Sequence, residues 1–271
     1  MIKDITIGQY FPQKSFVHAL DPRAKIIFTI MFLVLIFLCK NVWSLLLMVA
    51  LLLVTIFASK VPLKMFLKSI KPILPIIIFT TLLNIFYVSG GTTLVSWSIF
   101  TITTKGIYTA IFMAVRIVAL IMSSSLLTYT TTPTMLTDGI ERLLSPLTVF
   151  HIQVHTLAMM MTLALRFIPT LIDEIDRIMN AQKARGADLE SGGLIARSKA
   201  LIPILVPLLV SAFRRAYELA FAMECRCYQG GEGRTRMKKM KLGVRDFVSF
   251  ATLSLSIAGI VLLNIKFGSL V

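Results

Sequence analysis

Residues 26–58 read "IIFTIMFLVLIFLCKNVWSLLLMVALLLVTIFA", and this stretch decides the class of fold. It contains two apolar runs, Ile26–Cys39 and Val42–Ala58, separated only by Lys40 and Asn41. A bilayer-spanning helix needs about 20 largely apolar residues. A somewhat shorter run still qualifies when lysines at its ends can extend their stems to the membrane interface. We therefore predict two membrane-spanning helices that are joined by a tight turn and run antiparallel.

The composition of the whole chain points to the same class. Of its 271 residues 56% are hydrophobic and only 15% are charged, which is too little charged surface for a soluble protein of this size. The charge is strongly basic, with 28 Lys and Arg against 13 Asp and Glu. In a membrane protein such an excess usually lies in cytoplasmic segments, where it faces anionic lipid. We prefer this interpretation to nucleic-acid binding and expect no nucleic-acid partner.

Three further apolar segments, Pro72–Val88, Gly106–Thr128 and Phe247–Ile265, complete a set of five predicted spans. The basic residues then lie mainly on the side of the N-terminus, which the positive-inside rule makes cytoplasmic. Val149–Leu165 is also apolar, but a sixth span there would carry the basic run 234–241 to the outside. We therefore keep five spans in a multi-pass membrane protein.

The segments that connect the spans have their own patterns. In "SKVPLKMFLKSIKP" (59–72) lysines recur every three or four residues, which predicts a short helix at the membrane surface. Residues 89–106 are rich in glycine, serine and threonine and are expected to form an uncharged loop. The N-terminal segment is polar and broken by Pro12 and Pro22, unlike a signal peptide, so we expect it to be retained.

The long region between the fourth and last spans is amphipathic. Residues 165–187 ("LRFIPTLIDEIDRIMNAQKARGA") and 196–226 ("ARSKALIPILVPLLVSAFRRAYELAFAMECR") are apolar on one side and charged on the other. They predict long helices that lie against the membrane or a partner protein. The fold class is therefore an all-α integral membrane protein, with about five transmembrane helices and two long amphipathic cytoplasmic helices. Its three regions are 1–128, 129–246 and 247–271.

No set of catalytic or metal-binding residues emerges. His151 and His155 have a spacing suited to metal ligands on a helix, but a third ligand is missing, and we favour polar contacts at an interface. Cys39, Cys225 and Cys227 form no disulfide framework. The "GGEGRT" segment lacks the lysine and the preceding strand of a phosphate-binding loop. We expect no catalytic activity, no metal and no directly bound cofactor, so energy would come from another subunit.

Arg116 is the one charged residue deep in a predicted span. A charge there is costly unless it faces protein or water, which makes it a candidate functional residue. The alternative is that it pairs with an acid or with backbone carbonyls inside the bundle. A stand-alone secondary transporter or channel could use Arg116, but a proton or ion relay would need acidic residues, and the predicted spans contain none.

The two amphipathic helices are predicted to end alike. Ala181 precedes Arg185 by four residues, and Ala222 precedes Arg226 by four, with glycine following in both cases. One such arginine would be an ordinary C-terminal cation, favoured by the helix dipole. Two matched ends favour a pair of docking tips, because a guanidinium can form bidentate bonds to carboxylates of a partner.

A third hypothesis for the function is a surface anchor that binds anionic lipid through residues 234–241.

Four stretches together resemble the transmembrane T component of energy-coupling factor (ECF) transporters, which are vitamin and metal importers driven by ATP-binding-cassette subunits. The resemblance implies a non-catalytic scaffold whose two coupling helices dock their arginine tips into two ATPase subunits, where ATP is bound. It also implies a place in the prokaryotic cytoplasmic membrane, where the spans and the apolar sides of the coupling helices hold a substrate-binding S component among the membrane lipids. The four stretches are "LDPRAK" (20–25), "TTTPTMLTDGIERLLSPL" (130–147), "ALRFIPTLIDEIDRIMNAQKARGAD" (164–188) and "AFRRAYELAFAMECRCYQGGEGRTRM" (212–237).

The second tip departs from the family's Ala-Arg-Gly pattern because cysteines flank its arginine. Cysteine is small enough for a tight groove, but Cys227 lacks the conformational freedom of glycine, so we expect it to tune the geometry or affinity of one ATPase contact. The docking residues that the resemblance implies are Ala184, Arg185 and Gly186 at the first tip and Cys225, Arg226 and Cys227 at the second.

Overall fold

The computed structural model describes residues 10–88, 90, 92–97, 100–150, 152–187, 193–230 and 243–267. The described residues form two compact units. The bundle unit comprises residues 10–142 and 243–267, and the long-helix unit comprises residues 143–230. Each unit is described by itself. The boundaries at 128 and 246 that the sequence predicts for the membrane and coupling regions stay predictions.

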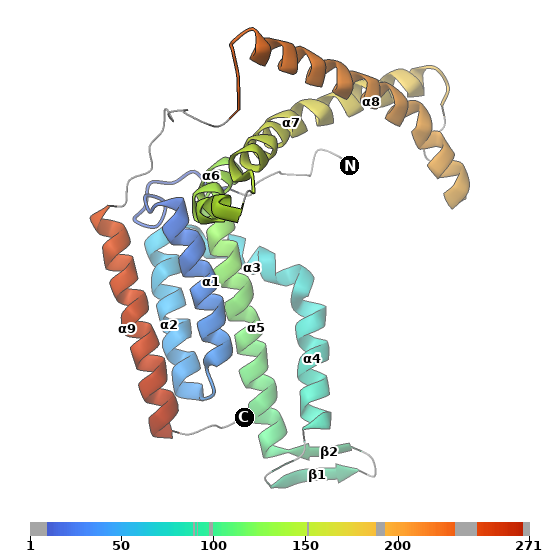
Figure 1. The fold of residues 1–271 in the computed structure, drawn as a ribbon. Coiled ribbons are helices and arrows are strands. Elements are labelled where there is room, and N and C mark those ends of the chain that lie inside the picture. The colour runs from blue at the N-terminus through green and yellow to red at the C-terminus, as the bar shows by residue number, and fades with distance from the viewer. Residues whose placement is uncertain are drawn as a thin grey trace. The chain divides into compact units, whose positions relative to one another are not determined.

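The bundle unit contains a helix for each of the five predicted spans. In this unit α1 and α2 lie between α9 and α5, and α4 packs on α5 (Figure 1). Two short elements, α3 (Leu63–Ile70) and the single turn η2 (Lys71–Ile73), lead into α4, and α6 follows α5. The helices are α1 (Pro22–Leu38), α2 (Val42–Ser59), α4 (Leu74–Tyr87), α5 (Thr104–Thr130), α6 (Pro133–Leu144) and α9 (Val244–Phe267).

A β-hairpin lies in the segment that the sequence predicts to be a loop. Strands β1 (Thr93–Trp97) and β2 (Phe100–Thr103) pair antiparallel, with Trp97 opposite Phe100. The physical reason is the run of threonine, valine and isoleucine, which favours an extended backbone. The strands are only five and four residues long, so the fold class remains all-α.

The long-helix unit consists of η3 (Ser145–Phe150), α7 (Val154–Ala184) and α8 (Leu194–Glu224). Each long helix has 31 residues, which corresponds to about 47 Å at the rise of an α-helix. Pro169 lies within α7, and Pro203 and Pro207 lie within α8.

Six of the described helices are long and apolar enough to cross a membrane. They include all of α7 and most of α8 and not α1, which has only 17 residues. Length and composition alone therefore do not separate the spans from the amphipathic helices, whose placement at the membrane surface stays a prediction. The chain is an all-α, multi-pass integral membrane protein. The six helices are Val42–Ser59, Leu63–Tyr87, Thr104–Thr130, Val154–Ala184, Lys199–Glu224 and Val244–Lys266.

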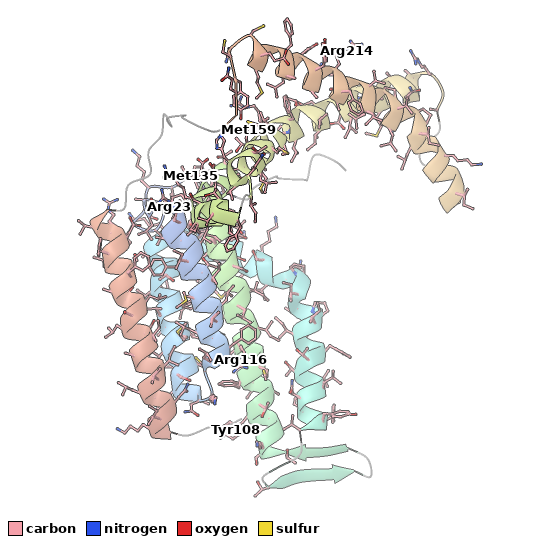
Figure 2. All side chains as sticks on the ribbon, in the orientation of Figure 1. Arg23, Tyr108, Arg116, Met135, Met159 and Arg214 are labelled. Carbon is pink, nitrogen blue, oxygen red and sulfur yellow. The ribbon has the colours of Figure 1, made fainter. Side chains whose placement is uncertain are left out.

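The turn between α1 and α2 is held by side-chain amides and by an arginine. Asn41, which is fully buried, donates from Nδ2 to the Leu263 carbonyl near the end of α9 (3.3 Å). In return, Nδ2 of Asn264 donates to the Leu38 carbonyl (3.0 Å). The Arg116 side chain extends from α5 toward the same turn (Figure 2). Asn264 and Arg116 thus satisfy carbonyls at the end of α1, and Asn41 satisfies one near the end of α9.

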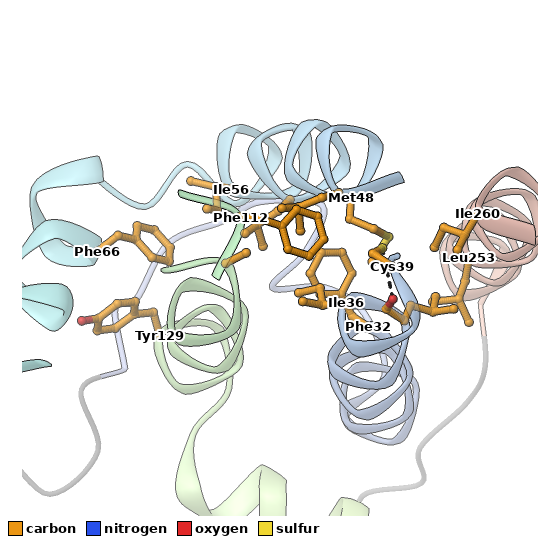
Figure 3. Packing of buried hydrophobic residues seen from close by; sticks show 14 of the residues in the cluster. Phe32, Ile36, Cys39, Met48, Ile56, Phe66, Phe112, Tyr129, Leu253 and Ile260 are labelled. Carbon is orange, nitrogen blue, oxygen red and sulfur yellow. Dashed lines mark hydrogen bonds between the residues drawn. The ribbon is translucent and has the colours of Figure 1, made fainter. Parts of the chain in front are cut away.

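The core of the bundle unit is built from the inner faces of α1, α2, α5 and α9. Phe32 and Ile36 of α1 belong to one buried cluster with Met48 of α2, Phe112 of α5 and Ile260 of α9 (Figure 3). Most of the apolar residues on the outer faces remain exposed, as expected where lipid replaces water as the solvent.

Candidate docking site

Helix α7 ends in a two-bond turn of the Schellman type. Gly186 has a left-handed backbone (φ 83°), and its N–H donates to the Lys183 carbonyl (3.0 Å). The next N–H, that of Ala187, donates back to the Gln182 carbonyl (3.0 Å). These bonds reverse the chain immediately after Arg185. The guanidinium therefore stands at the point where the helix stops.

Helix α8 ends in the same way. Cys227 is left-handed (φ 55°), and its N–H donates to the Glu224 carbonyl (2.9 Å). The N–H of Tyr228 then donates to the Met223 carbonyl (3.0 Å). Arg226 thus has the same place in its turn that Arg185 has at the end of α7. The two hydrogen bonds that define the turn at the end of α7 both have a counterpart at the end of α8.

The left-handed backbone of Cys227 refines the expectation for the second tip. The sequence indicates that the freedom of glycine is lost after Arg226, yet Cys227 takes up the conformation that Gly186 adopts at the first tip. A left-handed backbone costs a non-glycine residue about 1 kcal/mol or more. The second tip therefore keeps the geometry of the first and contains backbone strain that the first does not.

Both tips are accessible. All six predicted docking residues are exposed, and Cys225 and Cys227 are free thiols. At Gly186 nothing lies within 4 Å of the position that a Cβ would take, so its backbone angle alone restricts substitution. Within the described residues neither Arg185 nor Arg226 forms an ion pair or a side-chain hydrogen bond. Each guanidinium can therefore offer all its donors to a partner.

Polar contacts hold α7 and α8 together in antiparallel register. Glu174 of α7 accepts hydrogen bonds from Nη2 of Arg215 (2.5 Å) and from the Ser211 hydroxyl, both on α8. The Tyr228 hydroxyl, just beyond α8, contacts the sulfur of Met159 near the start of α7 (3.0 Å). As the residue number rises along α7, the contacted residue number falls along α8.

A proline in α8 creates a further contact between the helices. Pro207 has no N–H, so the Pro203 carbonyl one turn earlier lacks its usual helical donor. Nε2 of Gln182, three residues before Arg185, donates to this carbonyl (3.3 Å). The contact places the end of α7 beside the first half of α8.

This register separates the two tips. Pro203 lies beside the end of α7, and Arg226 is 23 residues further along α8. At 1.5 Å per residue the two guanidiniums are about 35 Å apart, at opposite ends of the helix pair. One small groove cannot receive both, so each tip presents its own site.

Arg116 makes the contacts that the backbone-carbonyl alternative describes. Its Nη2 donates to the Cys39 carbonyl at the end of α1 (2.7 Å), and its guanidinium lies 4.7 Å from the centre of the Phe112 ring. A cation at the end of α1 also complements the helix dipole. The packing of α1 against α5 therefore explains why a charged residue lies within this span.

A buried polar cluster was missed by reasoning from the sequence. Nζ of Lys25 donates to the carbonyls of Thr130 (2.9 Å) and His18 (3.1 Å), and Asp246 accepts from the backbone N–H groups of Asp21 (2.9 Å) and Gly243 (2.8 Å). The side chains of Lys25 and Asp246 are both buried. One signal was available, since a lysine in the first turn of an apolar helix opposes the helix dipole and needs a specific partner.

The same cluster explains two of the stretches that carry the family resemblance. Asp21 of "LDPRAK" caps α1 by accepting from the N–H of Arg23 (3.0 Å), and Pro22 occupies the first turn. Gly139 packs so closely that a Cβ there would lie 3.2 Å from Cβ of Pro22. Stretches 20–25 and 130–147 are therefore in contact in the bundle unit.

The described residues do not test whether His151 and His155 form a site. His151 lies outside the described residues, so its relation to His155 stays a prediction. Within the described chain no group of three or more His, Cys, Asp or Glu side chains could hold a metal ion.

Comparison with known proteins gives consistent matches over most of the chain. Residues 13–237 match the family model described as CbiQ, cobalt transport protein. The chain is 54% identical over 241 residues to the energy-coupling factor transporter transmembrane protein EcfT of Ruminiclostridium cellulolyticum, covering 89% of this chain and 90% of that protein. Proteins of the same name match from Clostridium kluyveri (53% over 250 residues; 92% and 93%) and Staphylococcus aureus (44% over 267 residues; 98% and 99%).

Proposed function

The chain belongs to the CbiQ family and, within it, to the transmembrane components of ECF transporters, and we propose that it couples two ATPase subunits to a substrate-binding S component. The observation that carries the proposal is the pair of helix ends with the same type of turn. Each presents one exposed arginine with no partner among the described residues, and they lie at opposite ends of one antiparallel helix pair. This arrangement suits a scaffold with two similar partners.

Each tip docks by charge-assisted hydrogen bonds. A guanidinium at a helix end enters a groove of an ATPase subunit and bonds to carboxylates there, while the small neighbouring residues allow a close approach. ATP binds to the ATPase subunits and not to this chain. Closure of the ATPase pair then displaces Arg185 and Arg226 relative to each other.

The helix pair carries this displacement to the membrane. The Glu174 contacts with Ser211 and Arg215, and the Gln182 contact with Pro203, join α7 to α8 along their length. A rigid rod transmits movement at its tip to its other parts, whereas a frayed end would absorb it. The S component receives the movement, reorients and releases a vitamin or another micronutrient.

The apolar surface of the long helices supports an S-component contact. Leu205, Leu209 and Phe213 follow one another every four residues on α8, and each is more than half exposed. Met160 and Met161 of α7 are also exposed, and methionine adapts its shape to different partners. Such a stripe is suited to an apolar partner in the plane of the membrane.

Charge reversal at the tips tests the proposal. The double variant Arg185→Glu/Arg226→Glu is expected to abolish co-purification of the ATPase subunits with this chain, and each single variant to weaken it. Arg214→Glu, an exposed position within α8, is the matched control and is expected to leave the complex intact. Stable assembly and undiminished ATP-driven uptake by the double variant would show that the tips do not dock the ATPases.

A further inference from the structure

Two cavities of the bundle unit meet at Phe16. The first has a volume of about 250 Å³ and lies among α1, α2, α5 and α9, close to where α2 ends and α9 begins. The second is a shallow basic pocket beside the N-terminal segment and the start of α9. Phe16 lines both, so an apolar and a charged space lie next to each other at one end of the bundle.

The wall of the first cavity offers almost no hydrogen bonds. Of the hydroxyl groups among its lining residues, all but that of Ser123 bond back to carbonyls of their own helices. An occupant is therefore held by apolar contact and not by polar recognition. The hydroxyl bonds are Thr29 to Lys25 (2.9 Å), Thr55 to Leu52 (2.8 Å), Thr130 to Leu126 (2.8 Å), Ser249 to Arg245 (2.9 Å) and Thr252 to Ser249 (2.8 Å).

The cavity opens on the surface of the bundle between α2 and α9. Val54 and Val248 line it and are 65% and 50% exposed. In the membrane an opening at this surface faces lipid. A dry apolar cavity of about 150 Å³ is enough to bind benzene, so one of 250 Å³ can hold a longer hydrocarbon segment.

The second pocket is suited to an anion. Lys14, Lys60 and Arg245 line it together with His18, and no acidic side chain is among its lining residues. Asp246, next to Arg245, directs its oxygens to the N–H groups of Asp21 and Gly243. The positive charge of the pocket is therefore not cancelled by its nearest carboxylate.

We propose that these two spaces form one binding site for an anionic phospholipid. A segment of its acyl chain fills the cavity among α1, α2, α5 and α9, and its phosphate lies among Lys14, Lys60 and Arg245. Phe16 lies at the junction, where the glycerol region of the lipid would be. Charge complementarity favours this occupant over a neutral lipid, and the shared residue Phe16 places the two spaces within reach of one molecule.

Photolabelling of the full chain tests the site. The chain is reconstituted in phosphatidylcholine nanodiscs that contain a trace of phosphatidylglycerol with a diazirine in one acyl chain. Labelled peptides are expected from the cavity wall, around Thr55 of α2 and Ser249 of α9. The same diazirine chain on phosphatidylcholine is the headgroup control and is expected to label these peptides much less. Equal labelling by the two lipids, or labelling only elsewhere, would overturn the proposal.

A triple variant tests the basic pocket. Lys14→Gln, Lys60→Asn and Arg245→Gln together are expected to lower phosphatidylglycerol labelling about tenfold or more, since each cation near an anionic surface contributes severalfold. Asparagine is chosen at Lys60 because that residue is left-handed (φ 58°), which asparagine tolerates. The control triple Lys40→Gln/Lys105→Gln/Lys266→Gln removes the same charge from other parts of the unit and is expected to retain labelling. Equal labelling of the two triples contradicts a role for the pocket.

A variant that fills the cavity tests whether the acyl chain lies there. A soluble competitor tests whether the site binds a lipid or a free anion. Ala58→Phe places a ring in the cavity wall and is expected to reduce labelling of α2 and α9 while the basic pocket stays intact. Unchanged labelling by this variant would show that the acyl chain does not occupy the cavity. Inorganic phosphate in millimolar excess is expected to compete poorly, because it gains nothing from the apolar space. Full protection by phosphate would identify an anion site in place of a lipid site.

Discussion

At the scale of single residues, Cys227 and Gly186 show how one backbone conformation can be reached by two side chains. Both are left-handed, and both donate the same hydrogen bond of the terminal turn. Glycine enters this region without a steric penalty, whereas cysteine does not. The two tips therefore differ in stability while they agree in geometry.

Single substitutions at Cys227 and at Gly186 should change the stability of their helix ends in opposite directions. Cys227→Gly is expected to stabilise the end of α8 by about 0.5–1 kcal/mol, because relief of strain outweighs the added freedom of the unfolded chain. Gly186→Ala is expected to destabilise the end of α7 by about 1 kcal/mol. Hydrogen exchange at the last turn of each helix measures both effects. Cys225→Gly, at a right-handed position (φ −58°), is the control, and a gain in stability there would contradict the argument.

His18 makes the N-terminal segment sensitive to acid. Burial lowers the pKa of His18 below its usual value of 6.5, and the charge of Lys25 lowers it further, against the opposing effect of the Phe11 and Tyr129 backbone groups. The unfolded chain then binds the proton more readily than the folded chain. Stability is therefore complete above about pH 6.5 and falls as the pH drops below it.

Thermal unfolding of the detergent-solubilised chain between pH 7.5 and 5.5 checks this prediction. The wild-type chain should lose stability on acidification, and His18→Gln should lose less over the same range. A parallel loss in both proteins would assign the effect to other groups.

At the scale of elements, the contact between α7 and α8 depends on a hydrogen bond that is missing within α8. Pro207 removes a donor from α8, and Gln182 of α7 replaces it at the Pro203 carbonyl. A break in one helix thus becomes a contact with the other. This contact could not be predicted from the sequence, because proline indicates the free carbonyl but not the residue that satisfies it.

A double-mutant cycle isolates this contact. Gln182→Leu is expected to destabilise the helix pair by about 1 kcal/mol, because it removes the hydrogen bond to the Pro203 carbonyl. In the background of Pro207→Ala, which restores the helical N–H, the same substitution should cost much less. The measurement is denaturant unfolding of the four proteins in detergent. Equal costs in both backgrounds would show that Gln182 does not act through this carbonyl.

The helical elements themselves were largely predictable, for a physical reason. A span must satisfy its backbone groups internally and expose apolar side chains to lipid, so residues 26–58 and the three later apolar runs could only be helices. The matched tips were predictable because Arg185 and Arg226 follow the same local pattern. The hairpin at 93–103 was not, since its strands are too short to show a clear alternation.

At the scale of the whole molecule, Asp246 connects parts of the chain that are far apart in sequence. It accepts from the N–H of Asp21, 225 residues away, at the point where α1 and α9 both begin. The sequence shows Asp246 only as the last residue before the final span, and no local pattern connects it to residue 21. Contacts of this kind are set by packing, which a single sequence does not report.

Neutralising Asp246 should weaken the bundle more than a surface substitution does. Asp246→Asn replaces one acceptor oxygen with an NH₂ group that would face a backbone N–H, and we expect a loss of about 1–3 kcal/mol. Glu218→Gln, at an exposed position on α8, is the control and should have little effect. Thermal unfolding in detergent compares them, and equal stability of the two variants would contradict a structural role for the carboxylate.

The exposed thiols at the second tip have a practical consequence. Cys225 and Cys227 flank Arg226 in the open, whereas Cys39, the third cysteine of the chain, is 1% exposed and donates to the Leu35 carbonyl. A maleimide dye or spin label should therefore attach next to the proposed docking arginine of the natural chain, without an engineered cysteine. The protein carries its own reporter position, from which nucleotide-driven movement of one tip can be followed by spectroscopy.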